Sequence, residues 1–188
     1  MGVGLAKAFS MPLLALALFV VSGPCIAESG ATEVFRLINE RLAFMKEVAM
    51  VKAKSGKPVE DRAREELVIT KAKERARQAG LDPSSIEEFF HTQISAAKAI
   101  QYRYLAEWAL SRNPPEREPR DLVTEVRPEL IRLGKEIVLA IRSFLGSGGR
   151  FTDTYFSEFL TAINVSNLNQ GEKGKLFESM RQIALSRT

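Results

Sequence analysis

Cysteine and histidine are nearly absent from this 188-residue sequence, which has one of each. The cysteine, Cys25, lies in an N-terminal segment that we expect to be removed, so the mature chain would have no disulfide and its fold would depend on packing alone. His91 has no second histidine and no cysteine at the spacing of metal ligands. We therefore expect His91 to pack or to face solvent, and we predict no metal site.

Long hydrophobic runs are also lacking, apart from one short run near the N-terminus. The apolar stretch of residues 11–21 follows a single charge, Lys7, and ends at Ser22-Gly23-Pro24. This pattern predicts a secretory signal peptide over residues 1–27, cleaved after Ala27, and hence a periplasmic or secreted protein. A membrane anchor is the alternative, but the run falls short of the ~20 residues that span a bilayer. Lipidation of Cys25 is disfavoured because Pro24 precedes it.

No block of like charge is present either. The 27 basic and 23 acidic residues are interspersed, and loss of Lys7 with the signal peptide lowers the formal net charge from +4 to +3. A mildly basic surface of this kind gives little support to nucleic-acid binding. With 45% apolar residues, the chain is long enough for one ordinary globular core.

Strand-like alternation is missing too, and every periodic stretch has helical spacing, so the predicted class is all-α. We expect a bundle of about six helices, over residues 31–54, 60–79, 83–111, 121–145, 152–164 and 170–186. Gly56, Gly80 and the pair Asp82-Pro83 mark helix ends and starts. A proline-rich linker over residues 113–120 divides a catalytic core, residues 28–112, from an accessory helical segment, residues 113–188. The helix after this linker is expected to bend at Pro128.

Charged residues recur on faces that should be apolar. Arg41, Met45, Val48 and Lys52 follow one another at helical spacing, so the two cations share a stripe with core-facing residues. One such cation is readily explained by a long side chain that reaches water over apolar surface. Two on one stripe, three turns apart, favour a functional role.

The next two helices repeat this pattern. Asp61, Arg64, Glu65 and Val68 share one face, and Gln101 interrupts the apolar stripe of the helix over residues 83–111. Burying such groups without partners costs several kcal/mol each, so they must satisfy one another or surround a charged ligand. Three cations against two carboxylates favour an anionic ligand.

Taken together, these residues resemble a known signature. Arg41, Lys52 and the run Lys57-Pro58-Val59-Glu60-Asp61-Arg62-Ala63-Arg64-Glu65 resemble the pattern of the all-helical chorismate mutases. The likeness covers roughly residues 40–108, including Leu81-Asp82-Pro83 and Ala99-Ile100-Gln101-Tyr102. The N-terminal segment and the additional helices resemble the exported branch of that family, although the second half is weakly matched.

The resemblance implies roles for the cations and for the glutamine. Arg41 and Arg64 would bind the carboxylate and ether region of chorismate. Lys52 would reach the ether oxygen and the adjacent carboxylate, and Gln101 would be the second donor to that oxygen. Loss of such a donor typically costs about 100- to 1000-fold in rate. Because glutamine does not titrate, we expect activity to be flat between about pH 6 and 8.

The resemblance also implies roles for four further positions. Asp61 would contact the substrate through its backbone, and Glu65 would accept a hydrogen bond from the ring hydroxyl. The family requires one more cation, for which Arg127 is the candidate and Arg120 the fallback. The expected substrate site consists of seven residues: Arg41, Lys52, Asp61, Arg64, Glu65, Gln101 and Arg127.

Two positions depart from the family pattern. Ala97 stands where a hydroxyl residue is common, and Val68 where some exported members have glutamine. We interpret both as changes in affinity, since neither removes a principal cation.

The implied reaction is a one-step rearrangement of chorismate to prephenate, on the route to phenylalanine and tyrosine, with no metal, organic cofactor or covalent intermediate. A homodimer with a complete site in each chain is implied as well. Two alternatives remain open: pyruvate elimination from isochorismate, which the exported architecture disfavours, and a non-catalytic periplasmic helical binding protein. Tyr102, Tyr104 and Trp108 are expected to be core residues rather than a stacking surface.

Overall fold

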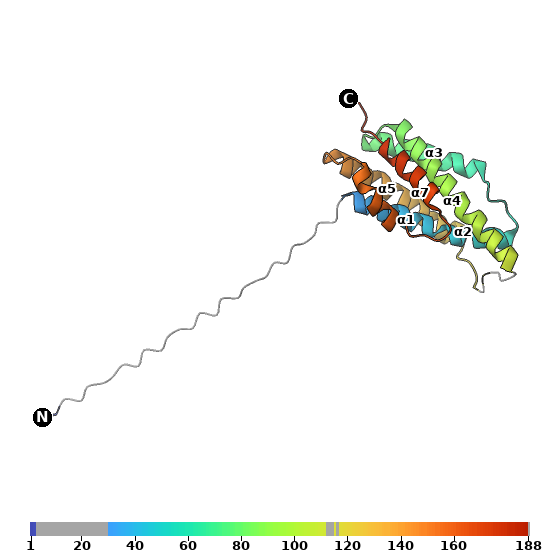
Figure 1. Ribbon diagram of the computed structural model, residues 1–188, viewed down its shortest axis with the longest axis horizontal. Helices are drawn as coiled ribbons and strands as arrows, with labels where there is room; N and C mark the ends of the chain where they lie inside the picture. The colour runs from blue at the N-terminus through green and yellow to red at the C-terminus, as the bar shows by residue number, and fades with distance from the viewer. Residues whose placement is uncertain (3–29, 112–114, 116, 188) are drawn as a thin grey trace.

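The computed structural model describes residues 1–2, 30–111, 115 and 117–187. Within these ranges the chain is all-α, and the one β-type pairing is an isolated bridge between Leu81 and Leu185. The α-helices are α1 (Gly30–Ala43), α2 (Met45–Ser55), α3 (Arg62–Ala79), α4 (Pro83–Ser111), α5 (Arg127–Gly146), α6 (Phe156–Ala162) and α7 (Gln170–Arg181) (Figure 1). A π-helical turn, η1 (Leu122–Val126), precedes α5, and a 3-10 turn, η2 (Asp153–Tyr155), precedes α6. The predicted signal peptide, residues 1–27, lies outside the described residues.

The first expected helix, over residues 31–54, is present as two helices. Between them Phe44 keeps right-handed dihedral angles (φ −64°, ψ −14°), and its carbonyl accepts a hydrogen bond from the Val48 N–H at 3.1 Å. The interruption is therefore a local distortion at Phe44, and α1 and α2 continue in nearly the same direction. Arg41 and Lys52, on either side of it, both remain directed to the same interior, as shown below.

Helix boundaries follow the capping residues. The Asp61 side chain accepts a hydrogen bond from the Arg64 N–H at 3.1 Å, so α3 begins at Arg62, two residues later than expected. Gly80, in the left-handed region at φ 76°, ends α3. Pro83 starts α4, as the Asp82-Pro83 pair predicted.

The helix after the linker differs from the prediction of one helix over residues 121–145. Residues 122–126 form the π-helical turn η1, in which the Val126 N–H donates to the carbonyl of Asp121 at 3.0 Å. Pro128, in the first turn of α5, has no N–H for the preceding turn, which accounts for the altered hydrogen bonding there. This irregular turn sets the position of Arg127.

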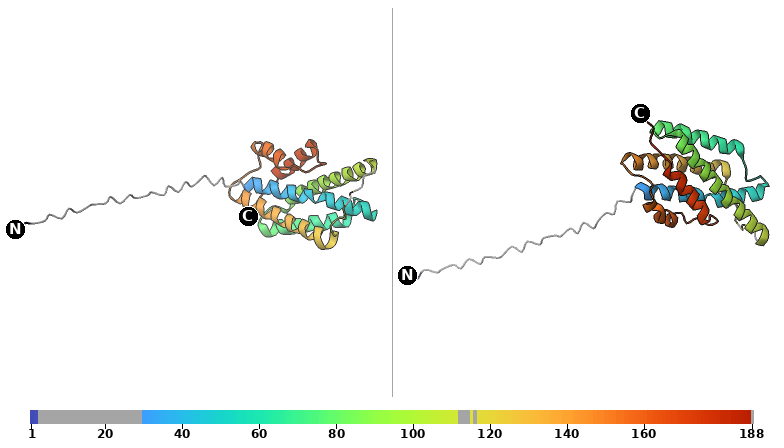
Figure 2. Two further views of the ribbon diagram at one scale, coloured as in Figure 1. Left: turned by 90° about the horizontal axis from the view of Figure 1, so that it is seen from below. Right: turned by 45° about the horizontal axis from the view of Figure 1, so that its top comes forward.

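The helices form three layers. In Figure 2, α1, α2 and α4 lie in the middle, α3 and α5 on one side, and α6 and α7 on the other. The most extensive packing joins α1 to α5, α3 to α4, and α2 to α4, while α7 packs on α4 and α6 on α1. The middle layer therefore has one face towards α3 and α5 and the other towards the C-terminal helices.

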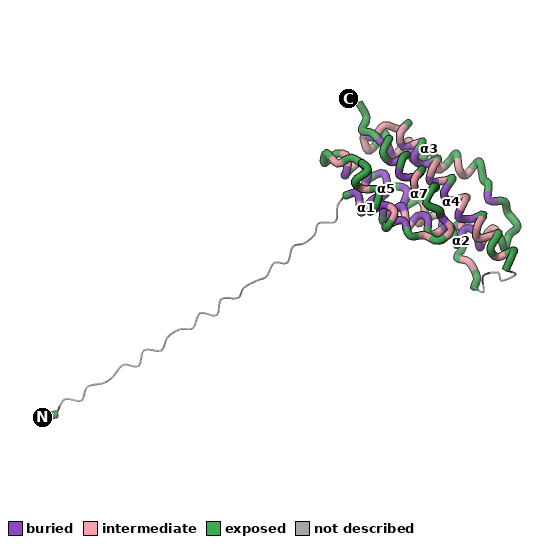
Figure 3. The backbone as a smooth tube through the Cα atoms, in the orientation of Figure 1, coloured by how far each residue is buried: buried purple, intermediate pink, exposed green. Residues whose placement is uncertain are grey.

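One hydrophobic core connects the two halves of the chain. Phe35 of α1 packs edge-on against Phe159 of α6, with ring centroids 5.3 Å apart, and the same cluster includes Ile100 of α4 and Leu133 of α5. The inward faces of the helices are accordingly buried (Figure 3). The expected boundary between residues 28–112 and 113–188 thus divides the sequence but not this cluster, and the domain division stays a prediction.

The aromatic prediction for the end of α4 was wrong for one residue. Tyr104 and Trp108 are partly buried and stack at 5.3 Å, whereas Tyr102 is 47% exposed and its hydroxyl donates to a carboxylate oxygen of Glu60. Tyr102 does not share the helical spacing of positions 97, 101, 104 and 108, which face inward, and it therefore projects from another side of α4. His91, also on α4, faces solvent.

Candidate active site

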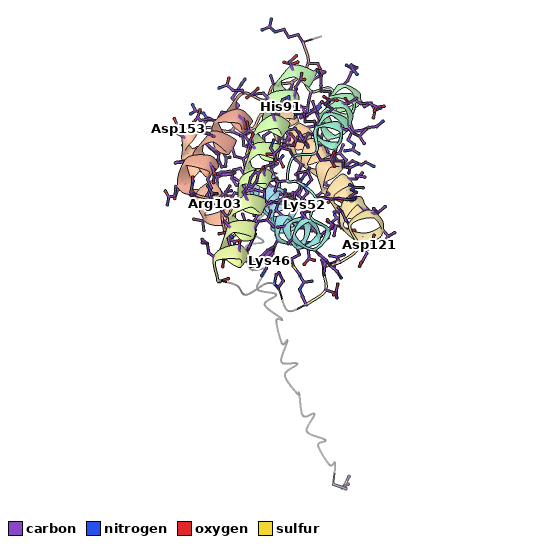
Figure 4. All side chains as sticks on the ribbon, turned by 90° about the vertical axis from the view of Figure 1, so that its right-hand side faces the viewer. Lys46, Lys52, His91, Arg103, Asp121 and Asp153 are labelled. Atoms are coloured by element: carbon purple, nitrogen blue, oxygen red, sulfur yellow. The ribbon has the colours of Figure 1, made fainter. Side chains whose placement is uncertain are left out.

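A cavity of about 340 Å³ lies among α1, α2, α3, α4, η1 and α5. Its volume is in the range of small-molecule sites. Every residue of the site expected from the sequence lines it: Arg41, Lys52, Asp61, Arg64, Glu65, Gln101 and Arg127. Figure 4 looks towards this region and shows Lys52 on α2, between α4 and α5, while Asp121 lies at the periphery.

Arg41 is the most deeply buried of these cations. It is 7% exposed, and its Nε has no hydrogen-bond partner. Burial, with the positive charges of Arg64 and Arg75, lowers the pKa of Arg41 to about 10. The group remains charged at neutral pH, and an anion bound in the cavity would relieve its electrostatic cost.

Lys52 and Arg64 lie in the same cationic environment. The Lys52 ammonium donates to the carbonyl oxygen of Val59, in the turn before α3. Burial lowers the pKa of Lys52, although the neighbouring Asp61 favours its charged form. The pKa of Arg64 is likewise lowered, by burial and then by the positive charge of Arg127.

Gln101 supplies a neutral hydrogen-bond donor to the cavity wall. Its side chain is 5% exposed, and Nε2 donates to the carbonyl of Ala97 at 3.0 Å. The second Nε2 hydrogen has only the sulfur of Met45, at 3.5 Å, a weak acceptor. The Oε1 atom has no partner. The amide can therefore donate to a stronger acceptor without losing its bond to Ala97.

Both carboxylates at the cavity are already engaged. Asp61 caps α3 through the Arg64 N–H, as described above, and its own N–H donates weakly to Glu65 Oε1 at 3.4 Å. Glu65 Oε2 forms an ion pair with Lys98 at 3.1 Å. Neither carboxylate forms an ion pair with the guanidinium groups in the cavity. These guanidinium groups therefore keep their positive charge without a direct counter-ion.

Sequence reasoning missed three basic residues of the cavity wall: Lys71, Arg75 and Lys98. The signal was present, because residues 61, 64, 68, 71 and 75 continue one face of α3 at helical spacing. Arg120, the fallback cation, does not line this cavity. Its side chain lies 3.6 Å from Glu125 and over the ring of Phe44.

A second cavity, of about 590 Å³, adjoins the first and shares Lys52, Asp61, Leu122 and Arg127 with it. One wall of it is the segment of residues 118–123. Polar contacts hold this segment against α2. Lys54 pairs with Glu118, and the Arg120 N–H donates to Glu47 at 3.2 Å. The first cavity therefore adjoins this segment, which contributes Leu122 to its lining.

No group of three histidine, cysteine or acidic residues that could hold a metal ion occurs in the part of the chain that the structure describes. Among the same residues, no helix has the length and apolar character required to cross a bilayer. The side chains present at the cavity are suited to binding an anion and to donating hydrogen bonds to it.

Comparisons with known proteins agree on one family. The family described as chorismate mutase type II matches residues 32–102. The chain is 36% identical over 146 residues to a monofunctional chorismate mutase of Enterobacter agglomerans, covering 78% of this chain and 79% of that protein. It is 38% identical over 149 residues to a secreted chorismate mutase of Yersinia pestis, covering 79% of each. The crystal structure of the secreted Yersinia pestis protein superposes with a TM-score of 0.75 at 36% identity, over 82% of this chain and 98% of that one.

Proposed function

The chain belongs to the type II chorismate mutase family and is an isomerase of that class, and we propose that it rearranges chorismate to prephenate in the cavity of α1–α5. Chorismate is a small dianion with two carboxylates, and the cavity has the size and charge that such a ligand requires. The proposal assigns the reaction to particular side chains.

One observation carries this assignment. Four guanidinium groups, those of Arg41, Arg64, Arg75 and Arg127, line the cavity, and within the described residues none of them is ion-paired. Like charges gathered without counter-ions destabilise the empty protein. A bound dianion supplies negative charge to these guanidinium groups. Relief of the repulsion between them then contributes to the free energy of binding.

The reaction is a pericyclic rearrangement in which one C–O bond breaks while one C–C bond forms, so no side chain has to act as a nucleophile. The protein must hold the flexible substrate in a compact, chair-like conformation, and this positioning is part of the rate enhancement. We assign the carboxylates to Arg41, Arg64 and Arg127, because these residues line the cavity from three separate helices, α1, α3 and α5.

The second requirement is to stabilise the negative charge that grows on the ether oxygen as the C–O bond breaks. We assign this role to the Lys52 ammonium and the Gln101 amide, which line the cavity from α2 and α4. Donors fixed in advance around a developing charge reorganise little during the reaction, which is why they are effective. Glu65 is assigned to the ring hydroxyl, and Asp61 to a contact through its backbone.

The experiment that tests the proposal is the decay of chorismate absorbance with purified protein beginning at Glu28. Wild type should consume chorismate and release prephenate. Lys52→Ala should lower kcat by about 100- to 1000-fold, because it removes a donor to the transition state. Arg77→Gln, which removes one charge from the solvent-exposed side of α3, is the matched control and should retain activity. Full activity of Lys52→Ala, with circular dichroism unchanged, would refute the assigned site.

Pyruvate elimination from isochorismate and simple ligand binding remain as the competing functions. The same assay separates them, because the elimination releases pyruvate from isochorismate and a binding protein consumes neither compound. The relatives named as chorismate mutases support the rearrangement.

We further propose that the protein is exported and acts outside the cytoplasm, since two relatives are named secreted chorismate mutases. The signal peptide of residues 1–27 predicts a mature N-terminus at Glu28, which N-terminal sequencing of the exported protein would check. A homodimer with a complete site in each chain, and a place in the synthesis of phenylalanine and tyrosine, complete the proposal. The seven positions that the family pattern requires, including the additional cation Arg127, line one cavity of this chain, which supports a complete site per chain.

A further inference from the structure

Arg75 is a cavity residue to which no role has been assigned so far. It lies on α3 eleven residues after Arg64, a rise of about 16 Å along the helix. Arg64 lies in the first turn of α3, and the charge of Arg127 acts on both Lys52 and Arg64, so these three cations form one group near the start of α3. Arg75 is therefore a separate source of positive charge, farther along the same wall.

The Arg75 side chain reaches from α3 to α5. A Cβ atom added to Gly134 of α5 would lie 3.6 Å from Arg75 Nη1 and 3.8 Å from Phe90 Cε1. The guanidinium thus lies against the bare backbone of α5 and beside an aromatic ring of α4. Both distances are ordinary van der Waals contacts, so the guanidinium packs directly beside the α5 backbone at position 134.

The Arg75 guanidinium has no direct counter-ion. Its side chain has no ion pair and no hydrogen bond within the described residues. Its charge acts on the Glu74 carboxylate, which pairs with Lys71, and in the cavity on another cation, Arg41. A purely structural arginine would be expected to pair with a carboxylate, as Arg103 does with Glu172 at 2.7 Å. Two unpaired guanidinium groups facing one cavity are suited to one carboxylate between them.

We propose that Arg75 is a further substrate-binding residue, which together with Arg41 holds the carboxylate of the substrate that lies away from Lys52. This inference rests on the proposed function, because it takes the substrate to be the dianion in this cavity. Apolar Ile94 and Leu130 line the cavity as well, so the two cationic regions are suited to the two carboxylates, with the ring between them.

The test is steady-state kinetics of Arg75→Gln and Arg75→Lys beside wild type. Because Arg75 is assigned to a carboxylate and not to the ether oxygen, it should contribute about equally in the ground state and the transition state. Arg75→Gln should therefore lower kcat/KM by about 10- to 100-fold, mainly through KM, with kcat within about threefold of wild type. Arg75→Lys, which keeps the charge, should recover part of the loss.

Two further measurements separate binding from a structural role. The inhibition constant of prephenate, which keeps both carboxylates, should rise by about the same factor as KM. The melting temperature of unliganded Arg75→Gln should equal or exceed that of wild type, since a repulsion is removed. Arg77→Gln removes the same charge two residues away on the exposed side of α3 and should change neither KM nor the inhibition constant.

An unchanged KM in Arg75→Gln would overturn the inference, as would a raised KM accompanied by a lower melting temperature and no recovery in Arg75→Lys. The Lys52→Ala variant keeps this outcome distinct from failure of the proposed function. If Lys52→Ala is inactive and Arg75→Gln is normal, only the role of Arg75 is wrong. If Lys52→Ala is fully active, the assigned site itself is wrong.

Discussion

Arg41 shows at the scale of a single residue how function opposes stability. Burial and two neighbouring cations lower its pKa, which means that the folded state disfavours the charged form. The folded protein binds this proton less tightly than the unfolded chain does. Stability consequently rises as the pH rises from the folded pKa of about 10 towards the unfolded value, and the full cost is present at neutral pH.

Arg41→Met should therefore abolish activity while making the protein more stable. Methionine has a similar length without the charge, so the free energy of unfolding at pH 7 should increase by about 1 to 3 kcal/mol. Urea denaturation followed by circular dichroism measures the change, and chorismate decay measures the activity. A less stable Arg41→Met would show that the guanidinium has structural partners, contrary to its unpaired Nε.

Gln101 determines the expected pH dependence. An amide donates a hydrogen bond at any pH, so wild-type kcat should be flat between about pH 6 and 8. In Gln101→Glu the same position donates only when the carboxyl is protonated. The variant should be more active at pH 5 than at pH 8, and Gln101→Leu should be impaired at both. A wild-type profile that falls steeply between pH 6 and 8 would contradict the role of Gln101.

At the scale of an element, η1 positions the first residue of α5. The Asp121 carboxylate accepts hydrogen bonds from the N–H of Val123 and Thr124 and from the Thr124 hydroxyl, at 2.6–2.9 Å. The bonds from Thr124 hold the pKa of Asp121 below its usual range. The cap is therefore intact at neutral pH and is lost only as the pH falls through this lowered pKa.

Asp121→Ala should weaken η1 and the placement of Arg127. Loss of the cap loosens the turn that holds Arg127, so kcat/KM should fall by about fivefold. Asp153→Ala is the control, since Asp153 begins η2 and pairs with Arg181 away from the cavity. The measurement is kcat/KM of both variants at pH 7. Equal activity of the two would mean that η1 does not determine where Arg127 lies.

At the scale of the whole molecule, the C-terminal segment ties α7 to the turn between α3 and α4. The Asp82 N–H donates to Ala184 at 2.9 Å, the Ser186 N–H donates to Gly80 at 3.0 Å, and Ile183 is buried. The prediction of a helix up to residue 186 was wrong here, because α7 ends at Arg181. The segment satisfies the backbone of the turn instead.

A chain that ends at Arg181 should melt about 4 to 10 °C lower than the full chain, mainly because the burial of Ile183 is lost. Its kcat at 25 °C should be retained, since none of the removed residues lines the cavity. Differential scanning calorimetry measures the melting temperature, and the chorismate assay measures kcat. A chain that ends at Ser186 keeps these contacts and is the control; an equal loss of melting temperature in both chains would contradict the assignment.

Helical spacing by itself determined much of this protein. The class, the starts of α3 and α4 within two residues, and the presence of Arg41, Lys52, Arg64 and Gln101 on inward faces all follow from local rules. Such rules depend on residues within a few turns of one another. They are therefore readable in the sequence before any tertiary contact is known.

Only the tertiary structure decided which faces of different helices meet. It placed Arg127 at the cavity and Arg120 outside it, although both flank the same turn, and it brought Arg75 against Gly134 of α5. The physical reason is that spacing fixes the direction of a side chain around its own helix axis, whereas its surroundings depend on how separate helices pack.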